Sequence, residues 1–183
     1  MRATSSESWA ASGSFPLTLR TLGLAIAGLS AVGLGGALAI EHIGGIRPCP
    51  LCLDQRIAYY AAIPLALLTA YLAGAQPLWS RLILTGLALG FAINAGLGVY
   101  HAGIEWGWWP GPDACSGIAP LATTPGALLE SLSQPNVVRC DAAALRILGL
   151  SLAGYSALLS AFLTALALLG ALRSRLYPAA TRA

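Results

Sequence analysis

Four apolar runs, each of the length that crosses a bilayer, constrain this chain more than any other feature of its sequence. They cover about residues 21–40, 57–75, 82–103 and 147–172, and none contains a Lys, Arg, Asp or Glu. A membrane-spanning helix needs about 20 such residues, and a charge near its centre costs about 2.5–3.5 kcal/mol. Backbone groups in lipid must be paired within the segment, and the runs lack the alternation of barrel strands, so each run predicts a helix. The sequence therefore predicts an all-α membrane protein with a four-transmembrane-helix bundle.

The composition excludes the other broad classes of protein. Hydrophobic residues make up 57% of the 183 residues and charged residues only 9%, whereas a soluble domain carries about 25% charged residues. Disordered chains are also rich in charge. The net charge of +3 is too small and too dispersed for a nucleic-acid-binding face. We predict one membrane domain over residues 17–175, with tails at 1–16 and 176–183.

The distribution of arginine predicts which side of the membrane each loop faces. Four spans place both tails and the loop 76–81 on one side, and loops 41–56 and 104–146 on the other. The side of the tails carries six arginines, and the opposite side carries four arginines together with six of the seven acids. Because arginine gathers on the cytoplasmic side of membrane proteins, both termini are expected in the cytoplasm. An Ala-Leu-Ala sequence at 37–39 leaves cleavage of the first run as a signal peptide open.

All four cysteines lie in the two loops that we predict to be non-cytoplasmic, where thiols tend to form disulfides. Cys49 and Cys52 form a C-x-x-C sequence, a spacing typical of reversible redox pairs, and Cys115 and Cys140 lie in the second loop. One alternative is two structural disulfides. A four-cysteine zinc site is another, although such sites usually draw on two tight cysteine pairs. The sequence favours a redox-active pair coupled to a second pair, and it predicts no metal site.

Arg56 follows Cys52 by four residues, at the start of the second apolar run. If the helix begins near Cys52, the two side chains share one face, and the guanidinium would stabilise a Cys52 thiolate together with the helix N-terminus. Arg56 could equally donate to an oxygen of a bound acceptor, or extend to the lipid headgroups as a membrane anchor.

The position of a thiol pair beside lipid also indicates which molecule accepts its electrons. Forming a disulfide releases two electrons, and a quinone is a lipid-soluble acceptor of two electrons. The sequence contains neither a C-x-x-C-H nor a G-x-G-x-x-G pattern, so no haem or dinucleotide motif competes.

Several segments together resemble the bacterial disulfide bond formation protein DsbB family. The likeness runs from about residue 20 to 172 and includes four spans and one cysteine pair in each outer loop. It is carried by Cys49-Pro-Leu-Cys-Leu-Asp-Gln-Arg56, Tyr100-His-Ala-Gly-Ile-Glu-Trp-Gly-Trp-Trp-Pro-Gly-Pro112, Cys115-Ser-Gly117 and Arg139-Cys-Asp141.

The resemblance implies an enzyme, a quinone-dependent thiol oxidase of the bacterial inner membrane. Such an enzyme reoxidises a periplasmic DsbA-like dithiol protein and uses ubiquinone or menaquinone as its cofactor. Cys115 would then take the attack of the partner's thiolate, and Cys140 would attack Cys49. Cys52 would face the quinone, with Arg56 near a quinone oxygen. A histidine near the end of the family's third helix corresponds by position to His101.

Two other functions compete with this one. The vitamin K epoxide reductases also place a C-x-x-C against a quinone in a four-helix bundle, but with the quinone-facing pair late in the bundle, whereas here it precedes the second span. A non-catalytic membrane scaffold with structural disulfides would show neither quinone reduction nor thiol turnover.

Overall fold

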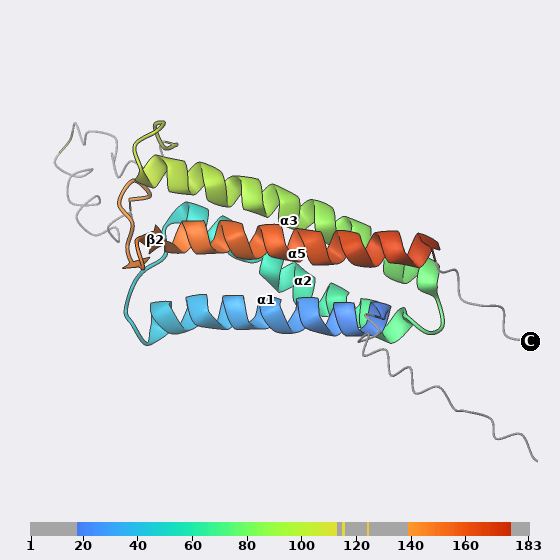
Figure 1. Cartoon of the computed structure of the whole chain (residues 1–183). Coiled ribbons are helices and arrows are strands. Elements are labelled where there is room, and N and C mark those ends of the chain that lie inside the picture. Colours follow the sequence, from blue (N-terminus) through green and yellow to red (C-terminus); the bar gives the residue numbers. More distant parts are fainter. Residues whose placement is uncertain (1–17, 113–114, 116–123, 125–138, 177–183) are drawn as a thin grey trace, which may run out of the picture.

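Four long helices make up most of the computed structural model, which describes residues 18–112, 115, 124 and 139–176 (Figure 1). The helices are α1 (Leu19–His42), α2 (Pro50–Leu72), α3 (Pro77–Glu105) and α5 (Leu152–Leu176). All four are long and apolar enough to cross a membrane, α5 over Leu152–Leu172. The predicted all-α, four-helix class is therefore confirmed. The predicted tail 1–16, residues 177–183 of the second tail and most of the loop 104–146 lie outside the described residues.

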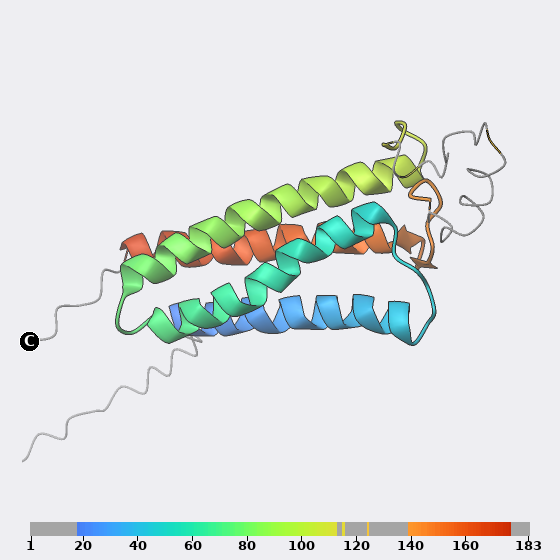
Figure 2. The ribbon, with the colours of Figure 1, turned by 180° about the vertical axis from the view of Figure 1, so that it is seen from behind.

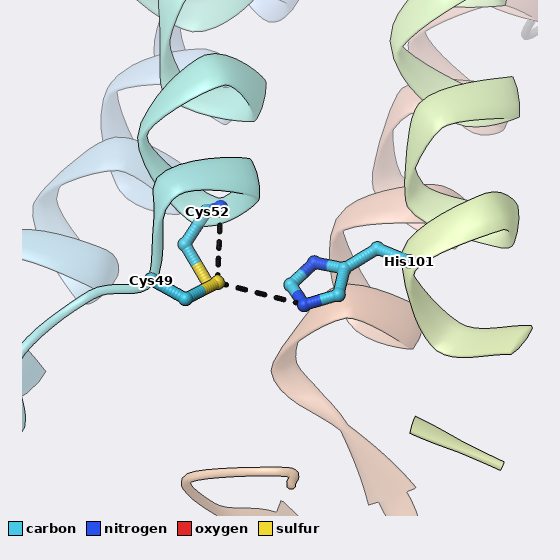
Figure 3. A group of neighbouring side chains, drawn as sticks. All are labelled: Cys49, Cys52 and His101. Atoms are coloured by element: carbon cyan, nitrogen blue, oxygen red, sulfur yellow. Dashed lines mark hydrogen bonds between the residues drawn. The ribbon is translucent and has the colours of Figure 1, made fainter. Parts of the chain in front are cut away.

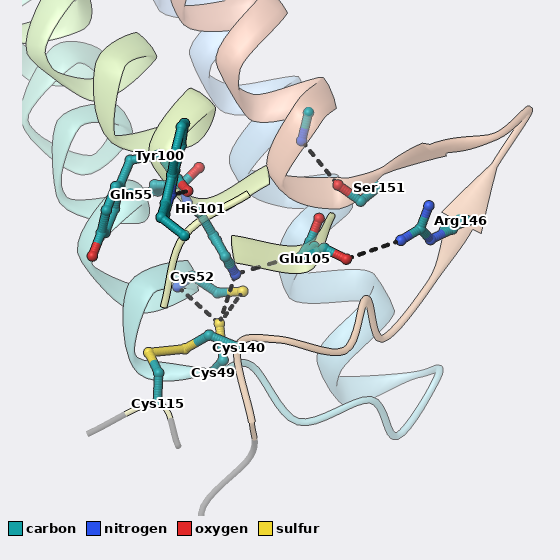
Figure 4. Close-up of polar contacts among 12 residues, drawn as sticks. Cys49, Cys52, Gln55, Tyr100, His101, Glu105, Cys115, Cys140, Arg146 and Ser151 are labelled. Carbon is teal, nitrogen blue, oxygen red and sulfur yellow. Dashed lines mark hydrogen bonds and ion pairs between the residues drawn. A yellow bond between two sulfur atoms is a disulfide. The ribbon is translucent and has the colours of Figure 1, made fainter. Parts of the chain in front are cut away.

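The helices form an up-and-down bundle (Figures 1 and 2). Neighbours in sequence pack against one another, α3 and α5 make the most extensive contact, and α1 also packs on α5. The start of α1, the α2–α3 connection and the end of α5 lie at one end of the bundle, and the other connections lie at the opposite end. All four cysteines lie at this second end (Figure 4).

Local sequence signals explain where the helices begin. The Thr18 hydroxyl accepts the N–H of Thr21 and caps α1 at its first turn. Pro50 occupies the first turn of α2 and Pro77 the first turn of α3, positions at which the missing N–H of proline costs no hydrogen bond. As a result α2 begins at Pro50 rather than at residue 57, and Arg56 lies in its second turn.

The start of the fourth helix also differs from the expected boundary at residue 147. The strands β1 (Arg146–Ile147) and β2 (Leu150–Ser151) pair as an antiparallel hairpin, and α5 follows at Leu152. The two turn residues, Leu148 and Gly149, have φ values of 52° and 83°, which a helix does not allow. The apolar run therefore contains a turn before its helix begins.

Small residues and buried polar bonds hold the helices together. A Cβ atom on Gly98 of α3 would lie 2.9 Å from Cβ of Ala157 in α5, so the absence of a side chain lets these helices approach closely. The Asn94 amide donates to the Ser160 hydroxyl at 2.9 Å, and the Tyr59 hydroxyl lies 2.9 Å from the same oxygen. Three helices thus share one buried polar junction.

Candidate active site

The C-x-x-C pair forms the N-terminal cap of α2. Cys49 is the N-cap residue, and its Sγ accepts the N–H of Cys52 at 3.3 Å, as a serine hydroxyl does in an ordinary cap (Figure 3). Both cysteines are free, and Cys49 donates its S–H to Cys52 Sγ across 2.7 Å. This hydrogen bond, together with burial, raises the pKa of the Cys49 thiol. In this state Cys49 is the protonated member of the pair.

His101 reaches the cysteine pair from α3. Its side chain is buried, with Nε2 3.5 Å from Cys49 Sγ and Nδ1 2.9 Å from Nε2 of Gln55 (Figures 3 and 4). The donor atoms of Cys49, Cys52 and His101 all lie within 4.8 Å of one another. The Gln55 contact fixes the orientation of the imidazole ring, so that Nε2 faces the dithiol.

The second pair of cysteines forms a disulfide beside the first pair. Cys115 and Cys140 are bonded to each other and almost fully buried. They lie beside Cys49 (Figure 4) and belong to one packed cluster with it. Ile104 of α3 packs in the same cluster. The two pairs thus occupy different redox states in direct proximity, a dithiol next to a disulfide.

Arg56 points toward the same region and is held there by α1. Its guanidinium forms an ion pair with the Glu41 carboxylate, and a second nitrogen donates to the Ala37 carbonyl at 3.4 Å. Only 12% of the Arg56 side chain is exposed. Arg56 is therefore a fixed part of the bundle interior at this end.

A cavity of about 280 Å³ lies between α1, α2 and α5, next to the cysteine pair. This volume lies near the lower end of the range for ligand pockets, which is about 300–1,000 Å³. Its wall is mostly apolar, and its polar members include Cys52, Gln55, Arg56, His101 and Glu105. Two buried oxygens there, Oε1 of Gln55 and Oε2 of Glu105, have no hydrogen-bond partner among the described residues. The cavity thus combines an apolar wall with polar atoms that remain open to a ligand.

The six residues singled out from the sequence come together at this one end of the bundle. Cys49, Cys52, Arg56 and His101 line the cavity, and Cys115 and Cys140 pack against Cys49. Sequence reasoning missed three further residues of the site: Glu41, Gln55 and Glu105. Gln55 and Glu105 stand inside the quoted motifs, next to Arg56 and one turn after His101. Their positions in those motifs were the available signal.

Comparison with known proteins points to one family. The family model described as "Disulfide bond formation protein DsbB" matches residues 19–170. A protein named disulfide bond formation protein B from Cupriavidus necator is 33% identical over 145 residues, which cover 76% of this chain and 84% of the relative. The protein of the same name from Cupriavidus metallidurans is 30% identical over 158 residues, covering 84% and 93%.

Coverage is lower for the relative from Ralstonia nicotianae, also named disulfide bond formation protein B. It is 32% identical over 109 residues, covering 59% of this chain and 63% of the relative. No solved structure is detectably similar to the chain. With four helices of spanning length, two adjacent cysteine pairs and a family match over most of its length, the chain belongs to the DsbB family and is a membrane disulfide bond formation protein.

Proposed function

We propose that the protein oxidises a DsbA-like dithiol protein in the periplasm and transfers the electrons to a membrane quinone. One observation carries the proposal: a dithiol with one buried and one half-buried sulfur lies between a disulfide on one side and an apolar cavity on the other. A thiol oxidase of this kind needs one pair that exchanges with a protein and a second pair that meets the electron acceptor. The family match favours this function over a vitamin K epoxide reductase.

The cavity residues fit a quinone head group. A quinone offers two carbonyl oxygens as acceptors on an apolar ring, and the cavity offers the guanidinium of Arg56 as a donor, and the imidazole of His101 when its Nε2 is protonated, within apolar walls. When bound, the quinone accepts two electrons and two protons. Ubiquinone and menaquinone share this chemistry, and both remain candidates.

The two cysteine pairs act in sequence. The thiolate of the partner attacks Cys115, and the Cys115–Cys140 bond breaks to release Cys140. Cys140 then attacks Cys49 in its disulfide with Cys52, and Cys52 leaves as a thiolate. Each transfer passes through a mixed disulfide because one sulfur attacks while another departs. Return of Cys115 to Cys140 completes the exchange and produces the arrangement described above, with a dithiol at Cys49 and Cys52.

The direction of the chain in the membrane follows from its arginines. We place both termini in the cytoplasm and the cysteine end of the bundle in the periplasm, at the outer face of a bacterial inner membrane. DsbA-like proteins act in the periplasm, so this orientation lets the Cys115–Cys140 disulfide meet its partner.

Trapping the mixed disulfide tests the proposed order. Cys140→Ser leaves Cys115 as a lone thiol, which attacks the disulfide of an oxidised DsbA-like protein. Because the second thiol of this pair is gone, a covalent complex through Cys115 should accumulate. Cys115→Ser is the matched control and should form no such complex. Non-reducing gels and peptide mapping give the result. A complex that accumulates in Cys115→Ser but not in Cys140→Ser would reverse the two roles, and no complex in either would contradict the function.

A further inference from the structure

Glu105 is a buried acid that the proposed electron path does not use. It ends α3, its side chain is only 6% exposed, and it lines the cavity. Its Oε2 atom is buried without a hydrogen-bond partner among the described residues. A carboxyl group in such a position is costly to keep ionised, because the charge is taken out of water. A group of this kind readily holds a proton and can give it up to a neighbour.

The neighbours of Glu105 connect it to the dithiol. Its Oε1 atom lies 3.8 Å from Nε2 of His101, and the same nitrogen lies 3.5 Å from Cys49 Sγ (Figure 4). A single ring nitrogen therefore stands between the carboxyl group and the sulfur.

Gln55 can fix the position of the proton on Nδ1, the second ring nitrogen of His101. With its amide turned, the unpartnered Oε1 of Gln55 accepts Nδ1–H of His101, and Nε2 is left as the basic nitrogen. In that tautomer Nε2 can take a proton from Glu105 and pass it to Cys49. It can equally take a proton from Cys49 and pass it to Glu105.

The other charged and titratable groups around Glu105 come from α2, α5, β1 and the loops. They are Cys52, Arg56 and Tyr59 of α2, Tyr155 of α5, Arg146 of β1, and Arg47 and Arg139 of the loops that line the cavity. Arg56 is paired with Glu41 and Arg139 with Asp141. Arg146 donates to the backbone carbonyl of Glu105 at 3.5 Å, and the Ser151 hydroxyl of β2 lies against the carboxyl group. Among the described residues, neither Arg56 nor Arg139 forms a salt bridge with the Glu105 carboxylate.

We propose that Glu105 is the proton donor of the dithiol, acting through His101 when Cys49 leaves its mixed disulfide with Cys140. This inference rests on the proposed exchange between the two cysteine pairs. In the step concerned, the Cys115 thiolate attacks Cys140, the Cys115–Cys140 bond forms and the Cys140–Cys49 bond breaks. The electron pair of that bond goes to Cys49, and its proton comes from Glu105 through Nε2 of His101. Glu105 recovers the proton when the dithiol is later oxidised.

Cys49 is the sulfur that needs such help. Burial and its contact with Cys52 raise the pKa of the Cys49 thiol, and a thiolate of a thiol with a high pKa leaves slowly. A proton delivered as the sulfur departs removes this penalty. Glu105 acts through His101, so it is a positioning and proton-supplying residue rather than one that touches the reacting sulfurs.

Exchange between the two pairs can be followed without a quinone, in the full-length protein. Fully oxidised, quinone-free protein is mixed with one equivalent of dithiothreitol, quenched in acid and alkylated, and peptide mass spectrometry counts thiols at each pair. The Cys115→Ser/Cys140→Ser double variant measures direct reduction of Cys49 and Cys52, which is subtracted. The measured quantity is the rate at which thiols appear at Cys49 and Cys52 from pH 5 to pH 9, a range chosen to bracket the titration of a buried carboxyl group and of a thiol.

The unmodified protein should give a bell-shaped pH profile, in which the rising limb reports the attacking thiolate and the falling limb the acid. Glu105→Gln should slow the exchange about 100-fold at the optimum, the lower end of what acid–base catalysis contributes, and should abolish the falling limb. Glu105→Asp should restore part of the rate and the limb. Asp54→Asn, which changes an exposed acid of α2, should match the unmodified protein.

An unchanged profile in Glu105→Gln would overturn the inference, as would an equal loss of rate at every pH with the falling limb intact, because that pattern marks a structural role. Absence of exchange at any pH in the unmodified protein would instead contradict the proposed function itself.

Discussion

Arg56 is a residue of α2 whose side chain is held by α1, and these contacts keep it at the cavity. It projects from the second turn of α2, but Glu41 and the Ala37 carbonyl, both in α1, hold its guanidinium. A lone arginine at this depth would extend to the lipid headgroups. The ion pair instead keeps the positive charge one helical turn from Cys52 and next to the cavity.

Replacing Arg56 with methionine tests its role, because methionine keeps the apolar stem and removes the charge. A hydrogen bond from a charged group contributes about 1.5–3 kcal/mol, so we expect the apparent KM for quinone to rise about 10- to 100-fold. Exchange of the Cys115–Cys140 disulfide with the partner protein should continue. Glu41→Gln, which keeps the arginine but removes its carboxylate, should give a smaller rise. If steady-state kinetics show an unchanged KM in Arg56→Met, Arg56 is a membrane anchor only.

At the scale of helices, the sequence predicted the number and type of elements but not all of their ends. Long uncharged runs specify spanning helices because lipid permits little else. The apolar run begins later than α2 because the polar residues between Cys52 and Arg56 fall outside it, although Pro50 is a typical first-turn residue. The start of α5 was missed because Leu148 and Gly149 are apolar in hydropathy yet form a turn.

The candidate site was predictable where its residues share a motif. The C-x-x-C spacing and Arg56 are local features, and the resemblance supplied His101. The contacts that complete the site join distant positions, as Glu41 to Arg56 and Gln55 to His101. Such contacts depend on how the helices pack, and a single sequence does not contain that information directly.

Two neighbouring glycines of α1, Gly35 and Gly36, allow a test of whether the cavity binds the quinone. Gly36 lines the cavity, and a Cβ atom there would meet no atom within 4 Å. Gly36→Leu should therefore fill the cavity without disturbing the bundle and raise the apparent KM for quinone by about 10-fold or more, which corresponds to 1.4 kcal/mol. Gly35→Leu is the control, since its Cβ also meets open space but Gly35 is not part of the cavity wall. Equal KM values in the two variants would argue against this cavity as the quinone site.

The contact between α3 and α5 predicts a difference in stability between two glycines of the same helix. Gly98→Ala would bring a Cβ atom to 3.0 Å from the backbone of Ala157, so the helices must separate, at a cost of about 1–3 kcal/mol. Gly96→Ala meets no atom within 4 Å and should be neutral or stabilise by up to about 1 kcal/mol through helix propensity. Denaturant unfolding in detergent measures both. Equal stabilities would show that close α3–α5 packing does not depend on Gly98.

Across the whole molecule, the arrangement separates two tasks. One end of the bundle carries the disulfide that we propose to exchange with a water-soluble partner, and the cavity beside it lies between helices of membrane-spanning length. DsbA-like proteins are strong oxidants, with potentials of about −120 mV, so an ordinary thiol pair cannot reoxidise them unless its electrons continue to a better acceptor. The position of the Cys49–Cys52 dithiol between disulfide and cavity is what this transfer requires.

Anaerobic quinone reduction by the purified protein measures this transfer directly. A reduced DsbA-like protein and a water-soluble quinone are mixed with the unmodified protein or with its Cys49→Ser or Cys52→Ser variant, and the quinone absorbance is followed. The unmodified protein should reduce one quinone for each partner disulfide formed, and either variant should reduce none at a comparable rate. Quinone that stays oxidised in the presence of the unmodified protein, or is reduced equally fast by the variants, would contradict the assignment of this dithiol as the electron donor.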